Sequence, residues 1–233
     1  LFQGEPGKGA RHLFGAQELV DRAVAARGGL EALAGIRTLI ADAETTMTAP
    51  QGRMQTRSRT YVEYPDRLRV EATVGSHEIV QVYADGRAWM RDPTGTYDAP
   101  PPMVDEFRAG VRRDLVALLR AAGARRLALA AEGEAGHEGR VLRIVSASGD
   151  DLAPVRLFID PTSGAVVKLA YQSAGPDGPV ATEEIFDDYR PVNGVSLPFK
   201  ASLIRNGTTV LERVLTAVQL NPDLPRDTFS KPQ

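Results

Sequence analysis

Tight-turn sequences divide the second half of this 233-residue chain into consecutive short runs of strand-forming residues. Two such turns are Asp160-Pro161-Thr162-Ser163-Gly164 and Val192-Asn193-Gly194-Val195, in which Asn and Gly tolerate a positive φ. Strands joined by turns this short must be antiparallel neighbours, because a parallel crossover needs about a dozen residues or more. The pattern predicts strands at residues 140–147, 153–160, 164–173, 180–190, 195–205 and 208–220.

The first half of the chain shows the same two-residue period. Its clearest strand covers residues 67–74, where polar and apolar side chains alternate, and residues 53–64 carry a similar pattern. Residues 77–84 and 87–90 flank Asp85-Gly86, which is typical of a β-hairpin. Together, the two halves predict one long antiparallel meander.

Two amphipathic segments interrupt this β pattern. Residues 14–27 repeat apolar side chains at helical spacing and end at Gly28-Gly29, a helix stop that a short turn of helix at 30–34 follows. Residues 98–102 contain three prolines and cannot continue a sheet. The long helix expected after them, 103–122, carries one apolar stripe, which consists of Val104, Phe107, Val111, Leu115, Leu118 and Ala122.

An antiparallel sheet of roughly ten or more strands does not stay flat, because strand twist accumulates and the sheet curls. The predicted fold class is therefore mainly β (α+β), with a single curled antiparallel sheet that forms an incomplete β-barrel and helices that plug its concave face. Two helices are a thin cover for so wide a sheet, which favours an apolar cavity beneath them. Tight packing of the helices without any void is the alternative.

No linker or shift in composition divides the chain, so we expect a single domain over residues 11–233. The first residues, Leu1-Phe2-Gln3-Gly4, resemble the end of a viral 3C-protease cleavage site used in expression vectors. We therefore expect residues 1–10 to be a tag remnant and a disordered start. Such a start leaves open whether a signal peptide or a lipid-bearing Cys precedes the native chain.

Composition removes several classes of function. Lys+Arg 28 and Asp+Glu 30 give a net charge of −2, which argues against a nucleic-acid binder. The chain has no Cys, so thiolate metal sites and Cys nucleophiles are absent. Residues His77 to Gln81 fail the zinc-peptidase pattern, because Gln81 stands where the second His would be, and no Ser-His-Asp set is apparent. We therefore expect no enzyme activity, no metal and no cofactor.

Several stretches together resemble LolA/LolB-like outer-membrane lipoprotein-sorting proteins. Each of these stretches contains a turn sequence that is weak evidence alone. Their order and spacing carry the resemblance, which extends from about residue 16 to residue 232. The matching stretches are residues 25–39 with Gly28-Gly29, Asp85-Gly86-Arg87-Ala88-Trp89, residues 157–164, residues 188–198 and the ending Leu220-Asn221-Pro222 with Asp227-Thr228-Phe229.

The resemblance implies an incomplete antiparallel barrel whose hydrophobic cavity holds acyl chains. It further implies a periplasmic carrier of a lipid or an acylated, lipoprotein-like molecule, either free or anchored to the outer membrane as a lipoprotein. Such a carrier touches the membrane surface peripherally and exchanges cargo with a partner protein of the inner or outer membrane. The alternative within the same fold is a non-catalytic envelope sensor or protein-interaction module.

The candidate ligand contacts are apolar and aromatic residues of the predicted helix and strands, each of which is either core or cavity wall. They are Trp89, Met90, Val104, Phe107, Val111, Leu115, Leu118, Phe158, Tyr171, Phe186, Phe199 and Leu203. Arg108, Arg112 and Arg113 are candidates for contact with an anionic headgroup or an acidic partner, or else form the solvated side of the helix. The acidic pair Glu183-Glu184 is expected to point to opposite faces and to be solvent-exposed.

Overall fold

The computed structural model describes residues 14–49, 52–175 and 177–232 of the protein. The expected tag remnant at residues 1–10 lies outside these ranges. Within them, the chain forms four helices and thirteen strands. The helices are α1 (Ala16–Ala26), α2 (Leu30–Ala34), α3 (Pro101–Arg113) and α4 (Leu115–Gly123). The strands are β1 (Thr38–Ala49), β2 (Gly52–Glu63), β3 (Arg67–Val74), β4 (His77–Ala84), β5 (Arg87–Asp92), β6 (Gly95–Asp98), β7 (Ala128–His137), β8 (Arg140–Gly149), β9 (Leu152–Ile159), β10 (Val166–Gly175), β11 (Gly178–Val192), β12 (Val195–Arg205) and β13 (Thr208–Leu220).

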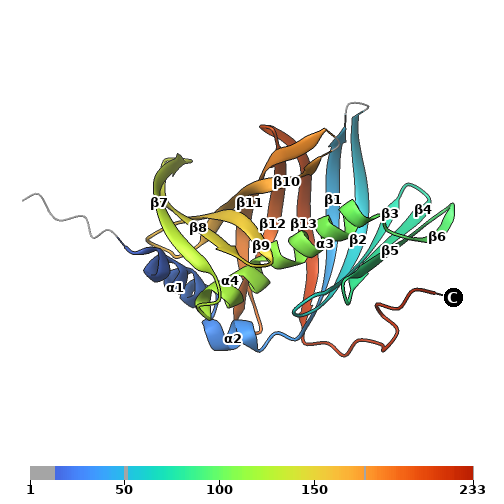
Figure 1. Ribbon diagram of the computed structural model, residues 1–233, viewed down its shortest axis with the longest axis horizontal. Helices are drawn as coiled ribbons and strands as arrows, with labels where there is room; N and C mark the ends of the chain where they lie inside the picture. Colours follow the sequence, from blue (N-terminus) through green and yellow to red (C-terminus); the bar gives the residue numbers. More distant parts are fainter. Residues whose placement is uncertain (1–13, 50–51, 176, 233) are drawn as a thin grey trace, which may run out of the picture.

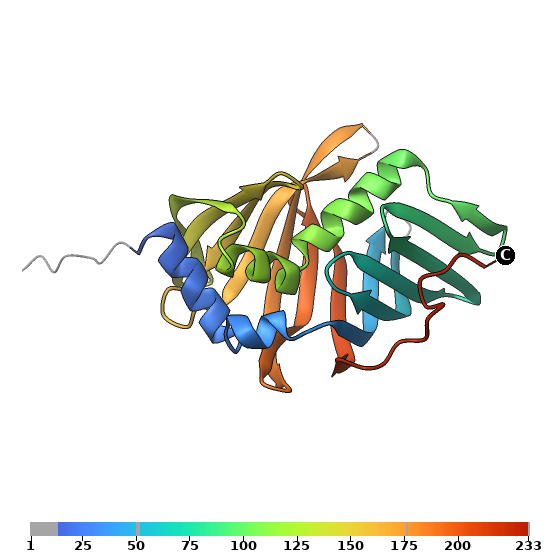
Figure 2. The same ribbon diagram turned by 60° about the horizontal axis from the view of Figure 1, so that its bottom comes forward.

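All thirteen strands belong to one antiparallel sheet, and the sheet is curled with helices on its concave face (Figures 1 and 2). This arrangement confirms the predicted fold class. The strand order is β6-β5-β4-β3-β2-β1-β13-β12-β11-β10-β9-β8-β7, so the sheet is open and its edges are β6 and β7.

The sheet differs from a single meander in one respect. Strand β1 pairs with β13, with Ala43 opposite Leu215, so two meanders meet at the centre of the sheet. Because β6 and β7 lie at opposite edges, the segment between them must cross the whole sheet. Helices α3 and α4 make this crossing over the concave face (Figure 2).

The predicted helix 103–122 is in fact two helices, and Asp114 separates them. Asp114 has a non-helical backbone (φ −48°, ψ 132°), and its side chain accepts hydrogen bonds from the backbone N–H groups of Val116 (3.1 Å) and Ala117 (3.0 Å). This is N-cap geometry, which starts a new helix at Leu115. The bend lets α3 and α4 follow the curved sheet at two angles.

The main core lies where α1, α2 and α4 cover the half of the sheet that ends at β7. Leu19 and Val20 of α1 and Leu118 of α4 are fully buried in it. Gly28, with a φ of +109°, packs directly against the turn between β11 and β12. A Cβ at this position would collide with the carbonyl oxygen of Gly194, so this close contact requires glycine. None of the helices among the described residues is long and apolar enough to cross a membrane.

Candidate functional site

A cavity of about 420 Å³ lies between the concave face of the sheet and helices α3 and α4. Its volume falls within the range of about 300–1,000 Å³ that is typical of small-molecule sites. The strands at the centre of the sheet supply most of its apolar wall, and the helices supply the rest. The apolar lining consists of Leu39, Ala41, Ala43, Val62, Leu68, Val70, Val111, Leu115, Val116, Phe186, Leu197, Leu203, Leu215 and Val218.

The wall is apolar because of strand alternation. On β1, Ala41 and Ala43 face the cavity, while Asp42 between them forms an ion pair with Arg59 of β2 on the other face. Small alanine side chains at these two positions leave space between the sheet and the helices. The two faces of the central strands therefore differ sharply, one being apolar and the other carrying ion pairs.

Polar side chains occupy part of the cavity wall as well. Arg113, which is only 9% exposed, donates to Glu106 Oε1 from its Nη2 (2.6 Å) and stacks over the ring of Tyr171, with 4.2 Å from Cζ to the ring centroid. The second carboxylate oxygen of Glu106 accepts a hydrogen bond from the backbone N–H of Ala174 (3.1 Å). Tyr171 in turn donates to Glu184 Oε1 (3.3 Å).

Burial shifts the pKa of two side chains in this wall, Glu184 and Tyr171. Desolvation raises the pKa of Glu184, and the positive charges of Arg213 and Arg113 partly oppose the rise. Desolvation also raises the pKa of Tyr171, with the nearby Glu184 acting in the same direction. A carboxyl group desolvated in this way is sensitive to any polar ligand group that enters the cavity.

A second polar group lies at the base of α4. Burial lowers the pKa of Arg27, which donates to the carbonyl oxygen of Ser196 (2.7 Å) and to the hydroxyl of Tyr189 (3.2 Å). Tyr64 donates to Asp114 (2.9 Å), the residue that caps α4, and burial raises the pKa of Tyr64 well above its usual range. These contacts fix the helix layer to the sheet, and Arg27, Tyr64 and Asp114 also line the cavity.

The sequence-predicted site residues separate into three groups. Val111, Leu115, Tyr171, Phe186, Leu203 and Arg113 line the cavity. Leu118 and Phe199 lie in the main core, and Met90, Val104 and Phe107 pack in a neighbouring cluster around Tyr83. The remaining four, Trp89, Phe158, Arg108 and Arg112, lie elsewhere.

Trp89 and Phe158 are on the opposite face of the sheet. Trp89 packs against Val80 and Val82, and its indole N–H donates to the carbonyl oxygen of Phe229 in the C-terminal segment (3.2 Å). Phe158 packs with Leu142 and Val167. Both are buried aromatic residues, as predicted, but they do not contact the cavity.

The three candidate arginines of α3 also lie in different surroundings. Arg108 forms an ion pair with Asp105 (3.0 Å), and Arg112 lies 3.9 Å from Asp151. Both are more exposed than Arg113, which is the one of the three that faces the cavity.

The expectation that Glu184 is solvent-exposed is wrong. Glu184 lines the cavity and hydrogen-bonds to Tyr171, while its neighbour Glu183 points to the other face and pairs with Lys168 (2.7 Å). The alternation of side chains along β11 indicates the correct face, because Glu184 is two residues from the buried Phe186 and therefore shares its face. Sequence reasoning also missed Glu106, Asp114 and Arg213 as cavity residues.

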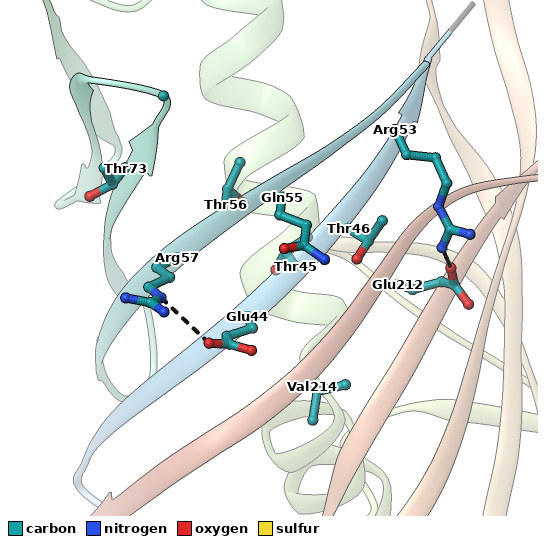
Figure 3. Close-up of a pocket in the computed structure, with 11 residues that line it drawn as sticks. Glu44, Thr45, Thr46, Arg53, Gln55, Thr56, Arg57, Thr73, Glu212 and Val214 are labelled. Atoms are coloured by element: carbon teal, nitrogen blue, oxygen red, sulfur yellow. Dashed lines mark hydrogen bonds and ion pairs between the residues drawn. The ribbon is translucent and has the colours of Figure 1, made fainter.

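A second depression, of about 720 Å³, lies near the β1–β2 hairpin (Figure 3). Its charged side chains already form pairs, Arg57 with Glu44 (3.4 Å) and Arg53 with Glu212 (2.7 Å), and all four are at least half exposed. Such a solvated polar groove suits neither an acyl chain nor a buried reaction. Among the described residues, no cluster of three or more His, Cys, Asp or Glu side chains is placed to hold a metal ion.

An open antiparallel sheet with a cavity beneath helices on its concave face defines the half-barrel class of fold. No family model and no curated protein matches this sequence. The fold is the LolA-like fold: the chain superimposes on a LolA superfamily protein from Nitrosomonas europaea with a TM-score of 0.62, at 11% identity over 94% of this chain and 98% of that one.

Two further solved structures share this fold. One is described as an outer membrane lipoprotein-sorting protein domain from Vibrio parahaemolyticus (TM-score 0.59, 9% identity, 92% of this chain and 96% of that chain). The other is a DUF1329 family protein from Desulfovibrio piger (TM-score 0.61, 11% identity, 92% and 97%). At these identities the likeness concerns the fold.

Proposed function

We propose that the protein is a non-enzymatic binder and carrier of a lipid or another acylated molecule in the periplasm. The observation that carries the proposal is the cavity of about 420 Å³ under α3 and α4, whose sheet side is lined mainly by apolar residues. The LolA-like fold supports the periplasmic setting, since one of the structures that share it is described as a lipoprotein-sorting domain.

The cavity volume limits the ligand. At about 30 Å³ per heavy atom, the share that one water molecule takes in the liquid, 420 Å³ holds one acyl chain of about a dozen carbons. Each buried methylene contributes about 0.8 kcal/mol, so a single chain binds reversibly. Reversible binding is what a carrier needs in order to take up and release its cargo.

A cavity-filling substitution tests the proposal. Leu215 lines the cavity, whereas its neighbour Val214 lies on the other face, where it lines the polar groove of Figure 3. Leu215→Trp should displace at least two methylenes of a bound chain and weaken binding of a dodecyl amphiphile by about tenfold or more. Val214→Trp should leave the affinity within about twofold of the wild type.

Isothermal titration calorimetry below the critical micelle concentration measures both variants, and circular dichroism establishes that each one folds. Equal losses of affinity in both variants, or a loss of affinity confined to Val214→Trp, would show that the chain binds outside the cavity. A wild-type protein that binds no chain at all would contradict the proposed function.

A further inference from the structure

The charged side chains that line the cavity are balanced. Three arginines, Arg27, Arg113 and Arg213, face three carboxylates, Glu106, Asp114 and Glu184. Arg113 pairs directly with Glu106. At longer range, the charge of Asp114 acts on Arg27, and the charges of Arg213 and Arg113 act on Glu184. A charged ligand group would therefore enter a site that offers no spare counter-charge, and burial of an uncompensated charge is costly.

Two polar side chains of the wall, Arg113 and Glu184, nevertheless have unused hydrogen-bonding capacity. Among the residues that the structure describes, Arg113 Nε is one of two buried side-chain nitrogens with no hydrogen-bond partner. Glu184 accepts from Tyr171 through Oε1, and a carboxylate can accept several hydrogen bonds in all. Arg113 therefore has one unpartnered N–H group and Glu184 has acceptor capacity to spare, and the two side chains contact the same residue, Tyr171.

From this wall we infer that the cavity selects single-chain amphiphiles with an uncharged polar head that both accepts and donates a hydrogen bond, such as an alcohol or a monoacylglycerol. The head accepts from Arg113 Nε and donates to Glu184, while the acyl chain lies along the apolar strands. This inference rests on the proposed function and narrows it to one ligand class.

Three amphiphiles with the same chain and different heads test the inference: dodecanol, dodecanoate and dodecylammonium. At pH 8, the wild type should bind dodecanol about tenfold or more tightly than either charged analogue. Calorimetry below the solubility limit of dodecanol, and below the critical micelle concentrations of the two charged compounds, measures the three dissociation constants.

Charge variants give the decisive comparison. Glu184→Gln leaves Arg213 without its carboxylate, so the ratio of dodecanoate to dodecanol affinity should rise about tenfold. Arg213→Gln, at an exposed position, should shift the preference toward dodecylammonium instead. Glu183→Gln removes the same charge from the opposite face of β11, where Glu183 pairs with Lys168, and should change neither ratio.

The outcomes separate the two proposals. If all three chains bind but dodecanoate equals or exceeds dodecanol in the wild type, or if the Glu184 and Glu183 variants behave alike, the head-group inference is overturned and the proposed function stands. If none of the three chains binds, the proposed function itself fails.

Discussion

Glu184 is a carboxyl residue of the cavity wall whose pKa is raised by burial. Desolvation raises its pKa, so the folded protein binds a proton at this site more readily than the unfolded chain does. Between the ordinary Glu pKa of about 4.3 and the higher folded value, the folded state carries more protons. The contribution of Glu184 to the free energy of unfolding must therefore fall as the pH rises through this interval.

Glu184→Gln removes that dependence. Relative to the wild type, this variant should become progressively more stable as the pH rises from about 4 to about 8, as measured by urea unfolding at each pH. Glu183→Gln is the matched control, because it removes a neighbouring carboxylate of β11 that lies on the other face of the sheet and pairs with Lys168. A Glu184 variant whose pH profile parallels that of the wild type would mean that this carboxyl group is fully hydrated.

Single residues were predictable where one periodicity determines the face. The predicted apolar stripe contains Val111 and Leu115, and both line the cavity, although Asp114 interrupts the helix between them. Trp89 and Phe158 could not be placed from sequence, because both faces of this sheet carry buried apolar clusters. An aromatic side chain in such a strand indicates burial without indicating the face.

At the scale of elements, the junction of α3 and α4 depends on Asp114. Its carboxylate caps α4 and accepts from Tyr64 of the loop after β2, so one side chain holds a helix start and a sheet contact. Asp114→Ala should lower the free energy of unfolding by about 1–2 kcal/mol, as urea denaturation would measure. Asp105→Ala, at an exposed position of α3, should cost less than about 0.5 kcal/mol, and equal costs would show that the cap contributes nothing.

The elements themselves were predictable to the extent that turns delimit them. The predicted strands 195–205 and 208–220 coincide with β12 and β13, because Asn193-Gly194 and Asn206-Gly207 mark both turns. Strand β7 was missed. It is an edge strand with mostly exposed side chains, so it shows no alternation of buried and exposed residues.

For the whole molecule, the pairing of β1 with β13 determines where the cavity forms. The pairing joins residues near the two ends of the chain, and no turn sequence signals it. It brings Ala41 and Ala43 beside Leu215 and Val218 at the centre of the concave face, under the crossing helices. Turn sequences predict which consecutive strands are neighbours, but the pairing of strands distant in sequence depends on how the two meanders assemble into one sheet.

The location of a bound chain shows whether this cavity holds an acyl ligand. A crystal structure of the complex with dodecanol brominated at its last carbon would locate the chain end by anomalous scattering. We expect a bromine peak among Ala43, Leu215 and the other apolar cavity residues, with the hydroxyl group near Arg113 and Glu184. A bromine peak in the polar groove beside Arg53 and Glu212, or on the Trp89 face, would contradict it.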